Sequence, residues 1–188
     1  GIGGHIAFID TVMYAKEHGL VVIIDAKRSD ISSTAEAYAN TFLGESNFFG
    51  EKKPVMDADC ITVSPYLGRD SLEPFIRACK SYGKGIFVLV KTSNPGSSDF
   101  QNLRMADGKE LYVHVAEMVN EYSKDLIGKY GYSSIGAVVG ATFPEEARRI
   151  RKLMPNSIFL VPGYGAQGGT AAGAVECFNE DGYGAVVN

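Results

Sequence analysis

The feature that most constrains the fold of this chain is a regular alternation of short apolar runs with longer helical patterns. Six β-branched runs are predicted as strands, at residues 20–25, 60–64, 85–91, 135–140, 157–161 and 184–187. Helical patterns separate these runs, which is typical of parallel βα units. Residues 43–58 are expected to form an irregular excursion. No linker interrupts the chain, so residues 1–188 are predicted as one domain.

Start and stop signals mark several of the helices. Residues 5–18 are predicted as a helix that precedes the first strand. Helix starts are predicted at Ser33, Asp70 and Thr142, because each has a glutamate three residues later. Gly83 is predicted to end one of these helices.

Nearly continuous apolar strands fit either a (β/α)8 barrel or a doubly wound open sheet, and hydrophobic periodicity does not distinguish the two. The segments after the strands do, because nearly every strand is followed by polar or glycine-rich residues. A barrel gathers such segments around one mouth, where barrel enzymes keep their active sites. The predicted fold class is therefore α/β, a (β/α)8 TIM barrel.

The barrel is predicted to be incomplete, with about six of its eight strands, because a full barrel typically needs about 250 residues. The chain begins with Gly1, inside or just before a helix, and stops at Asn188 while the last strand is still running. We expect two strands and the helix between them to be missing at the front, and the last loop and helix at the back. Since such a barrel exposes sheet edges, these residues alone are predicted to be inactive and poorly stable.

Charge and apolar patterning exclude several classes of protein. A net charge of -4 and a pI near 5.4 argue against nucleic-acid binding. No run of about 18 apolar residues could span a bilayer, and no signal peptide is recognisable. Cys60, Cys79 and Cys177 lack metal-like spacing, so buried free thiols in a reducing cytosol are expected rather than a disulfide framework. The predicted location is the cytoplasm.

One segment, residues 21–30, carries the strongest chemical signal. Its apolar strand delivers Asp25, Lys27, Arg28 and Asp30 together at the carboxyl end. Side chains two residues apart on a strand share a face, so Asp25 and Lys27 point the same way and alter each other's proton affinity. That geometry suits proton transfer. A structural ion pair that closes the strand remains the alternative.

Five segments together carry a family resemblance. They are DAKRSDISSTA at 25–35, TVSPYLG at 62–68, KTSNPG at 91–96, GAVVGAT at 136–142 and VPGYGAQGG at 161–169. In this order they resemble orotidine 5'-phosphate decarboxylase of the longer bacterial type, over essentially the whole chain. Several motifs at matching spacing are more specific than one Asp-x-Lys-x-x-Asp motif, which related barrels share. One departure is Ser29, where the family commonly has glycine.

The resemblance implies decarboxylation of orotidine 5'-monophosphate to uridine 5'-monophosphate, in de novo pyrimidine nucleotide synthesis, without a metal or an organic cofactor. Loss of carbon dioxide from C6 of the pyrimidine leaves a vinyl carbanion with no adjacent carbonyl, so fixed charges must stabilise it. By similarity, Lys27 stabilises this charge and then protonates C6, flanked by Asp25 and Asp30. An amine held between carboxylates should stay protonated.

The resemblance also implies a homodimer whose sites are shared between subunits. Asp30, with Ile31 and Thr34, is expected to complete the site of the partner subunit rather than its own. The family's further lysine, from the preceding strand, and its phosphate-binding arginine, after the final strand, are expected to lie outside this chain. For Thr34, an ordinary place on a helix surface remains the alternative.

Phosphate recognition is expected in the glycine-rich stretch 163–170, since glycines expose backbone N–H groups to an anion and a helix begins nearby. By similarity, Gln167 closes over the phosphate, and Gly168 and Gly169 let the backbone approach it. Pro162 belongs to the same predicted substrate-binding segment. A flexible connection without a ligand is the alternative.

Pyrimidine recognition is expected at Ser93, which matches the family's base-contacting serine. Pro95 and Gly96 would shape the loop that carries it. The polar segment 94–101 is predicted to fold over the bound nucleotide and exclude water. A solvent-facing loop without a role is the alternative.

Two other functions fit the same residues. A metal-dependent sugar-phosphate decarboxylase or hexulose-phosphate synthase of the same barrel group would use Asp25 as a magnesium ligand and Lys27 electrostatically. A non-catalytic nucleotide-binding module is the second alternative. No zinc motif or catalytic triad is present, and the histidines fall in helical patterns that favour surface or interior roles over metal ligation: His5, His18 and His114.

Overall fold

The computed structural model describes residues 1–188, which divide into two compact units, Gly1–Ile86 and Phe87–Asn188. Each unit is an alternation of parallel strands and helices, and each is described by itself. Strand β5 (Gly85–Lys91) begins in the first unit and continues in the second.

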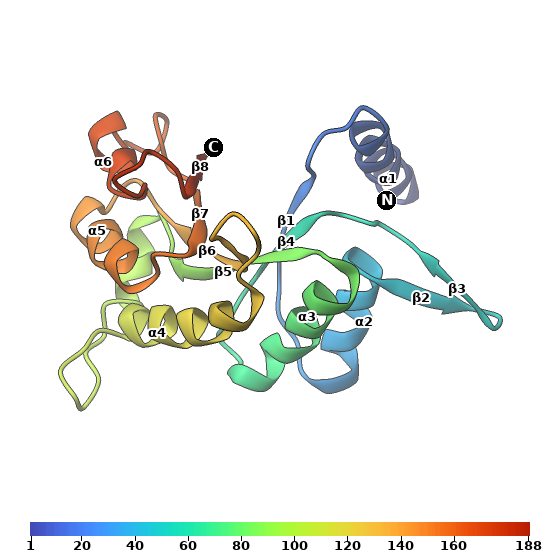
Figure 1. Ribbon diagram of the computed structural model, residues 1–188, viewed down its shortest axis with the longest axis horizontal. Coiled ribbons are helices and arrows are strands. Elements are labelled where there is room, and N and C mark those ends of the chain that lie inside the picture. Colours follow the sequence, from blue (N-terminus) through green and yellow to red (C-terminus); the bar gives the residue numbers. More distant parts are fainter. The chain divides into compact units, whose positions relative to one another are not determined.

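The first unit is built on a parallel pair of strands. Strand β1 pairs with β4, and β5 follows β4 in the strand order. Helices α2 and α3 lie side by side (Figure 1), and Leu72 and Phe75 of α3 are buried, as is Ile61 of β4. The elements are α1 (Ile2–Glu17), β1 (Ile23–Arg28), α2 (Ser32–Phe42), β2 (Glu45–Phe48), β3 (Glu51–Pro54), β4 (Cys60–Val63) and α3 (Arg69–Tyr82).

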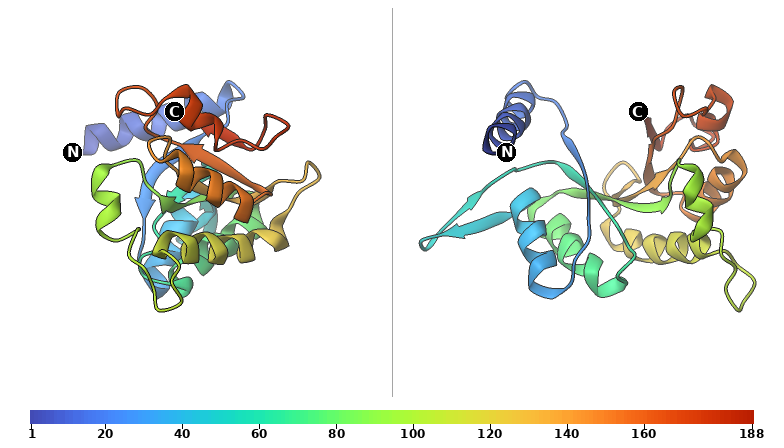
Figure 2. Two further views of the ribbon diagram at one scale, coloured as in Figure 1. Left: turned by 90° about the vertical axis from the view of Figure 1, so that its left-hand side faces the viewer. Right: turned by 180° about the vertical axis from the view of Figure 1, so that it is seen from behind.

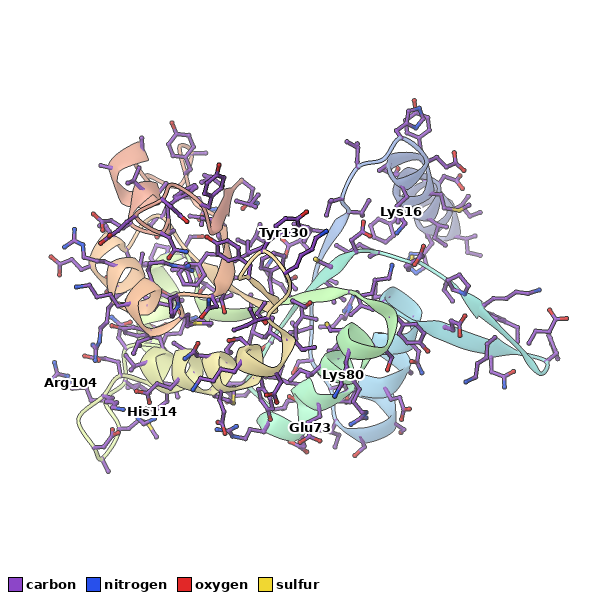
Figure 3. The ribbon with its side chains drawn as sticks, viewed as in Figure 1. Lys16, Glu73, Lys80, Arg104, His114 and Tyr130 are labelled. Carbon is purple, nitrogen blue, oxygen red and sulfur yellow. The ribbon has the colours of Figure 1, made fainter.

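Helix α1 is attached to the rest of this unit by charged side chains. Lys16, labelled on α1 in Figure 3, lies 3.3 Å from Asp57 and 3.2 Å from Asp59. Lys84 pairs with Asp57 at 2.7 Å, and Asp59 accepts the backbone N–H of Val22 at 2.8 Å. The network therefore joins α1 to the segments that lead into β1, β4 and β5.

The second unit continues the sheet in the order β5-β6-β7-β8. Strand β7 pairs in parallel with both β6 and β8. Helix α4 packs against β6 and α5 (Figure 2), which buries Val119, Ile135 and Ile150. The elements are η1 (Pro95–Asp99), α4 (Leu111–Ser123), η2 (Lys124–Leu126), β6 (Ser133–Val139), α5 (Pro144–Leu153), β7 (Ser157–Val161), α6 (Ala171–Val175) and β8 (Ala185–Val187).

All six predicted strands are confirmed, as β1, β4, β5, β6, β7 and β8. The first lies three residues later than predicted, at 23–28 rather than 20–25, so Asp25 and Lys27 belong to the strand itself. The prediction of an irregular segment at 43–58 is wrong in part, because an antiparallel β2–β3 hairpin occupies it (Figure 2). Its strands are mostly polar, which hid them from a search for apolar periodicity.

The predicted helix starts lie within two residues of the observed ones, but their capping contacts are absent. Helices α2, α3 and α5 begin after Ile31, Gly68 and Phe143, and none of them has a side-chain cap. The predicted stop at Gly83 is confirmed, since this residue ends α3 in the left-handed conformation with φ of 66°.

The three cysteines are free thiols, as predicted. Cys79 and Cys177 are buried, and burial raises the pKa of each thiol to about 12, so both stay protonated at neutral pH. His114, on α4 near Arg104 of the preceding loop (Figure 3), pairs with Asp107 at 3.1 Å. None of the helices is both long and apolar enough to cross a membrane.

Candidate active site

The first unit holds a charged pair at the end of β1. The Nζ atom of Lys27 lies 2.6 Å from both carboxylate oxygens of Asp25, so the two side chains share a face, as predicted. Both are about half exposed, at 51% for Lys27 and 58% for Asp25. An ammonium that is held in place yet open to a ligand can donate a proton and can stabilise a negative charge.

A third residue, Thr62 of β4, completes this cluster. Its hydroxyl donates to Oδ1 of Asp25 at 2.8 Å and accepts the backbone N–H of Lys27 at 2.9 Å. Burial opposes ionisation of Asp25, but the hydrogen bonds from Lys27 and Thr62 and the charge of the lysine outweigh it. The pKa of the Asp25 carboxyl therefore lies below its usual value. In the sequence, Thr62 stands out only as part of the motif at 62–68, and no role was predicted for it.

Asp30 does not join the pair. Its Oδ1 accepts the backbone N–H of Ile31 at 2.8 Å, and no hydrogen bond or ion pair connects it with Lys27. Ile31 and Thr34, at the start of α2, have exposed side chains. The hydroxyl oxygen of Ser29 is buried without a hydrogen-bond partner, which is a local cost of a side chain where the resembling family has glycine.

The second unit holds a polar contact between two loops. The Ser93 hydroxyl, after β5, donates to Oε1 of Gln167, after β7, at 2.8 Å. The Thr142 hydroxyl, after β6, donates to the Ser93 carbonyl at 2.8 Å. A pocket of about 590 Å³ opens beside them, a volume in the range of small-molecule sites. It is lined by Ser93, Asn94, Pro95, Ser98, Thr142, Phe143 and Gln167.

The glycine-rich stretch folds tightly beside this pocket. Gly163 has φ of 94°, and a Cβ there would lie 2.7 Å from the Ser93 Cβ. The backbone N–H groups of Gly168 and Gly169 donate within the turn, at 2.8 Å and 2.9 Å. These glycines therefore shape the turn that presents Gln167. Pro162, partly buried just after β7, accepts the backbone N–H of Ala141 at 2.9 Å.

The segment predicted to fold over a nucleotide is ordered by its own contacts. Residues 95–99 form η1, and Gln101 bonds back to Thr92 through both its amide oxygen and its amide nitrogen. The buried ammonium of Lys91 donates to the Ser97 hydroxyl at 2.8 Å. The sequence did not reveal the role of Lys91, because a lysine at the end of a strand is normally exposed to solvent.

No three His, Cys, Asp or Glu side chains within residues 1–188 lie close enough together to hold a metal ion. The structure brings Asp25 and Lys27 together in the first unit, and Ser93 and Gln167 together in the second. Asp30, Ile31 and Thr34 follow β1 and form no hydrogen bond or ion pair with the lysine.

Comparison with known proteins gives consistent matches. The sequence model of the "Orotidine 5'-phosphate decarboxylase / HUMPS family" matches residues 3–181. A curated orotidine 5'-phosphate decarboxylase of Caldicellulosiruptor bescii is 53% identical over 175 residues, which cover 93% of this chain and 57% of that protein. One from Rhodopirellula baltica is 50% identical over 188 residues, 100% of this chain and 61% of that protein.

A solved structure matches as well. The "Structure of Leishmania donovani OMP decarboxylase" is 38% identical, with a TM-score of 0.77, and the match covers 100% of this chain and 66% of that one. This similarity confirms the predicted (β/α)8 fold class. The chain spans 57% to 61% of the length of these two curated relatives.

Proposed function

Because the chain belongs to the orotidine 5'-phosphate decarboxylase / HUMPS family, we propose that the protein decarboxylates orotidine 5'-monophosphate to uridine 5'-monophosphate. The observation that carries this proposal is the Lys27 ammonium, held on the Asp25 carboxylate by two contacts of 2.6 Å at the end of β1. The names of the curated relatives support the same reaction.

The reaction breaks the bond between C6 of the pyrimidine and its carboxylate. Carbon dioxide leaves, and the bonding electron pair stays on C6 as a carbanion. Lys27 stabilises this charge electrostatically and then transfers one proton from Nζ to C6. Asp25 holds the ammonium in place before that step, through two contacts of 2.6 Å.

The second unit supplies the groups that bind the nucleotide. Ser93 contacts the pyrimidine, and Gln167 contacts the phosphate in the turn shaped by Gly168 and Gly169, with Pro162 in the same segment. The hydrogen bond between Ser93 and Gln167, at 2.8 Å, supports these roles, since it joins the two recognition loops.

Asp30, Ile31 and Thr34 complete the site of a second copy in a homodimer. The absence of a hydrogen bond or ion pair between Asp30 and Lys27 supports this role, as does the exposure of Ile31 and Thr34 at the start of α2. A cytoplasmic location follows from the reaction, which consumes and produces soluble nucleotides.

The proposal is tested by following the conversion of orotidine 5'-monophosphate by the protein expressed from its own gene, with and without EDTA. We expect uridine 5'-monophosphate and carbon dioxide in equal amounts, at a rate that EDTA does not change. Magnesium-dependent release of carbon dioxide from a sugar phosphate, without turnover of the nucleotide, would favour the metal-dependent relatives instead. Tight nucleotide binding without any turnover would favour a non-catalytic module.

Site sharing between subunits is tested with two inactive variants, Asp30→Ala and Lys27→Ala. Mixed before refolding, they should recover activity, because some hybrid dimers contain one site with both residues intact. Verified hybrid dimers without any recovered activity would contradict the assignment of Asp30 to the partner's site.

A further inference from the structure

Strand β1 departs from regular pairing at the point where it presents the charged pair. Ile24 lies opposite Ile61 of β4, but the next paired residue, Arg28, lies opposite Val63. Four steps along β1 thus correspond to two along β4, so β1 bulges over this stretch. Within the bulge Lys27 has φ of 48°, a left-handed conformation that is unfavourable for a residue with a side chain.

Thr62 lies directly opposite this bulge, between Ile61 and Val63. It is fully buried, at 0% exposure. Its hydroxyl accepts the Lys27 backbone N–H at 2.9 Å, which gives that group the partner the irregular ladder does not provide. The same hydroxyl donates to Asp25 at 2.8 Å. A hydroxyl has a single hydrogen. Here Thr62 donates it to Asp25, so toward Lys27 the hydroxyl oxygen can only accept.

We propose that Thr62 is a positioning residue, whose buried hydroxyl fixes the backbone of Lys27 and the carboxylate of Asp25 at once and thereby aims the ammonium. The inference rests on the proposed decarboxylation, because it assigns Thr62 a part in that chemistry. The Thr62 hydroxyl acts on Lys27 in two ways. It bonds to the main-chain N–H of Lys27, and it bonds to the Asp25 carboxylate that holds the ammonium. Loss of the hydroxyl frees both together.

A second pair in the same unit shows what the hydroxyl adds. Lys53 and Glu51 are also two residues apart on a strand and also lie 2.6 Å from each other. Both are more exposed, at 63% and 70%, and no buried hydroxyl bonds to either of them. The two-residue spacing alone is therefore enough for an ion pair on the hairpin, whereas the Thr62 hydroxyl also connects the pair on β1 to strand β4.

The test replaces Thr62 by valine, which keeps the shape and removes the hydroxyl, and by serine, which keeps the hydroxyl. In Thr62→Val we expect kcat to fall by about 10- to 100-fold with KM changed by less than about threefold, since the pair is misplaced but nucleotide contacts remain. Thr62→Ser should recover most of kcat. Thr41→Val, a change on α2 of the same unit, serves as the control and should leave both constants unchanged.

Two measurements do not depend on turnover. NMR titration should show that Thr62→Val raises the pKa of the Asp25 carboxyl and that Thr62→Ser restores it, because a donor to the charged form is lost and regained. Hydrogen exchange of the Lys27 amide should become about tenfold faster in Thr62→Val. These shifts in a protein without turnover would retain the positioning role and reject the decarboxylation.

The opposite result also distinguishes the positioning role of Thr62 from the proposed decarboxylation. A wild-type enzyme with full turnover, in which Thr62→Val changes neither kcat nor the Asp25 titration, would overturn the positioning role alone. Should Thr62→Val fail to fold, the wild-type protein still decides: the Lys27 amide must exchange as slowly as paired amides of β1. Exchange at the rate of an open chain would overturn the inference.

Discussion

Two lysines near the carboxyl ends of parallel strands, one in each unit, are held under opposite conditions. Lys27, at the end of β1, is half exposed and lies 2.6 Å from the carboxylate of Asp25. Lys91, the last residue of β5, is fully buried, has no carboxylate in contact, and bonds instead to the hydroxyl of Ser97. Its Nζ lies 4.0 Å from the centre of the Phe143 ring.

The difference separates a lysine that we propose to act on a substrate from a lysine whose observed contacts are structural. An exposed ion pair such as Lys27 and Asp25 contributes little to the free energy of unfolding. A buried amine with only neutral partners is costly to ionise. Burial accordingly lowers the pKa of Lys91, although the charge of Glu146 partly opposes that shift. Its bond to Ser97 attaches η1 to the sheet.

The largest effect on activity is expected when Lys27 loses its carboxylate. In Asp25→Asn we expect kcat to fall by about 100-fold or more, because the carboxylate that holds the ammonium in place is lost. Steady-state kinetics with orotidine 5'-monophosphate measures the change. Asp10→Asn on α1, an exposed aspartate, should leave kcat unaltered. Equal kinetics for Asp25→Asn and Asp10→Asn would contradict the proposed chemical role of the Lys27–Asp25 pair.

The corresponding change at the other lysine should act on stability. Ser97→Ala leaves the buried ammonium of Lys91 short of a partner and is expected to lower the free energy of unfolding by about 1.5–3 kcal/mol. Urea unfolding measures it. The double variant Lys91→Met with Ser97→Ala should be more stable than Ser97→Ala alone, since both polar groups are then gone. A double variant less stable than the single one would contradict this reading.

A smaller effect is expected from alkaline pH. Because the pKa of Lys91 is lowered from 10.5, the unfolded chain binds more protons than the folded one between the lowered value and 10.5. The contribution of Lys91 to stability should therefore become more favourable as pH rises through that window. The urea midpoint of the wild type should therefore rise relative to that of Lys91→Met through this window, since every other group is common to the two proteins. The same slope in both proteins would exclude Lys91 as its source.

The smallest effect is expected on stability at the exposed pair. Lys27→Met should change the free energy of unfolding by less than about 0.5 kcal/mol, since exposed ion pairs are weak and screened by water. A matched change on the hairpin, Lys53→Met, should behave alike, because its pair with Glu51 has the same spacing and distance. If Lys27→Met lowered the free energy of unfolding as much as Ser97→Ala does, the stability difference proposed between Lys27 and Lys91 would be wrong.

Much of the fold was predictable from the sequence, because β-branched runs mark the six strands and their spacing marks parallel βα units. The pair of Asp25 and Lys27 was predicted from the two-residue period of a regular strand, and it is observed although β1 bulges at this point. The hairpin at β2 and β3 was not predictable, since its strands have no apolar alternation.

Other parts of the site depend on contacts that sequence spacing does not contain. Thr62 gains its role only because β1 bulges opposite it, and nothing in the sequence marks that change of register. Ser93 and Gln167 are 74 residues apart, and the family resemblance gave each a separate binding role, so their contact follows only from the fold. The burial of Lys91 likewise depends on η1 folding back over the end of β5.

The most direct test of the account is the turnover of Lys27→Ala beside that of Lys53→Ala, with binding of uridine 5'-monophosphate measured on both proteins. Lys27→Ala should lose about 10²- to 10⁴-fold in kcat while nucleotide binding stays within a few-fold, since only the reacting carbon needs the proton donor. Lys53→Ala should keep both properties. Turnover of Lys27→Ala equal to that of Lys53→Ala would contradict the central claim that the ammonium at the end of β1 performs the chemistry.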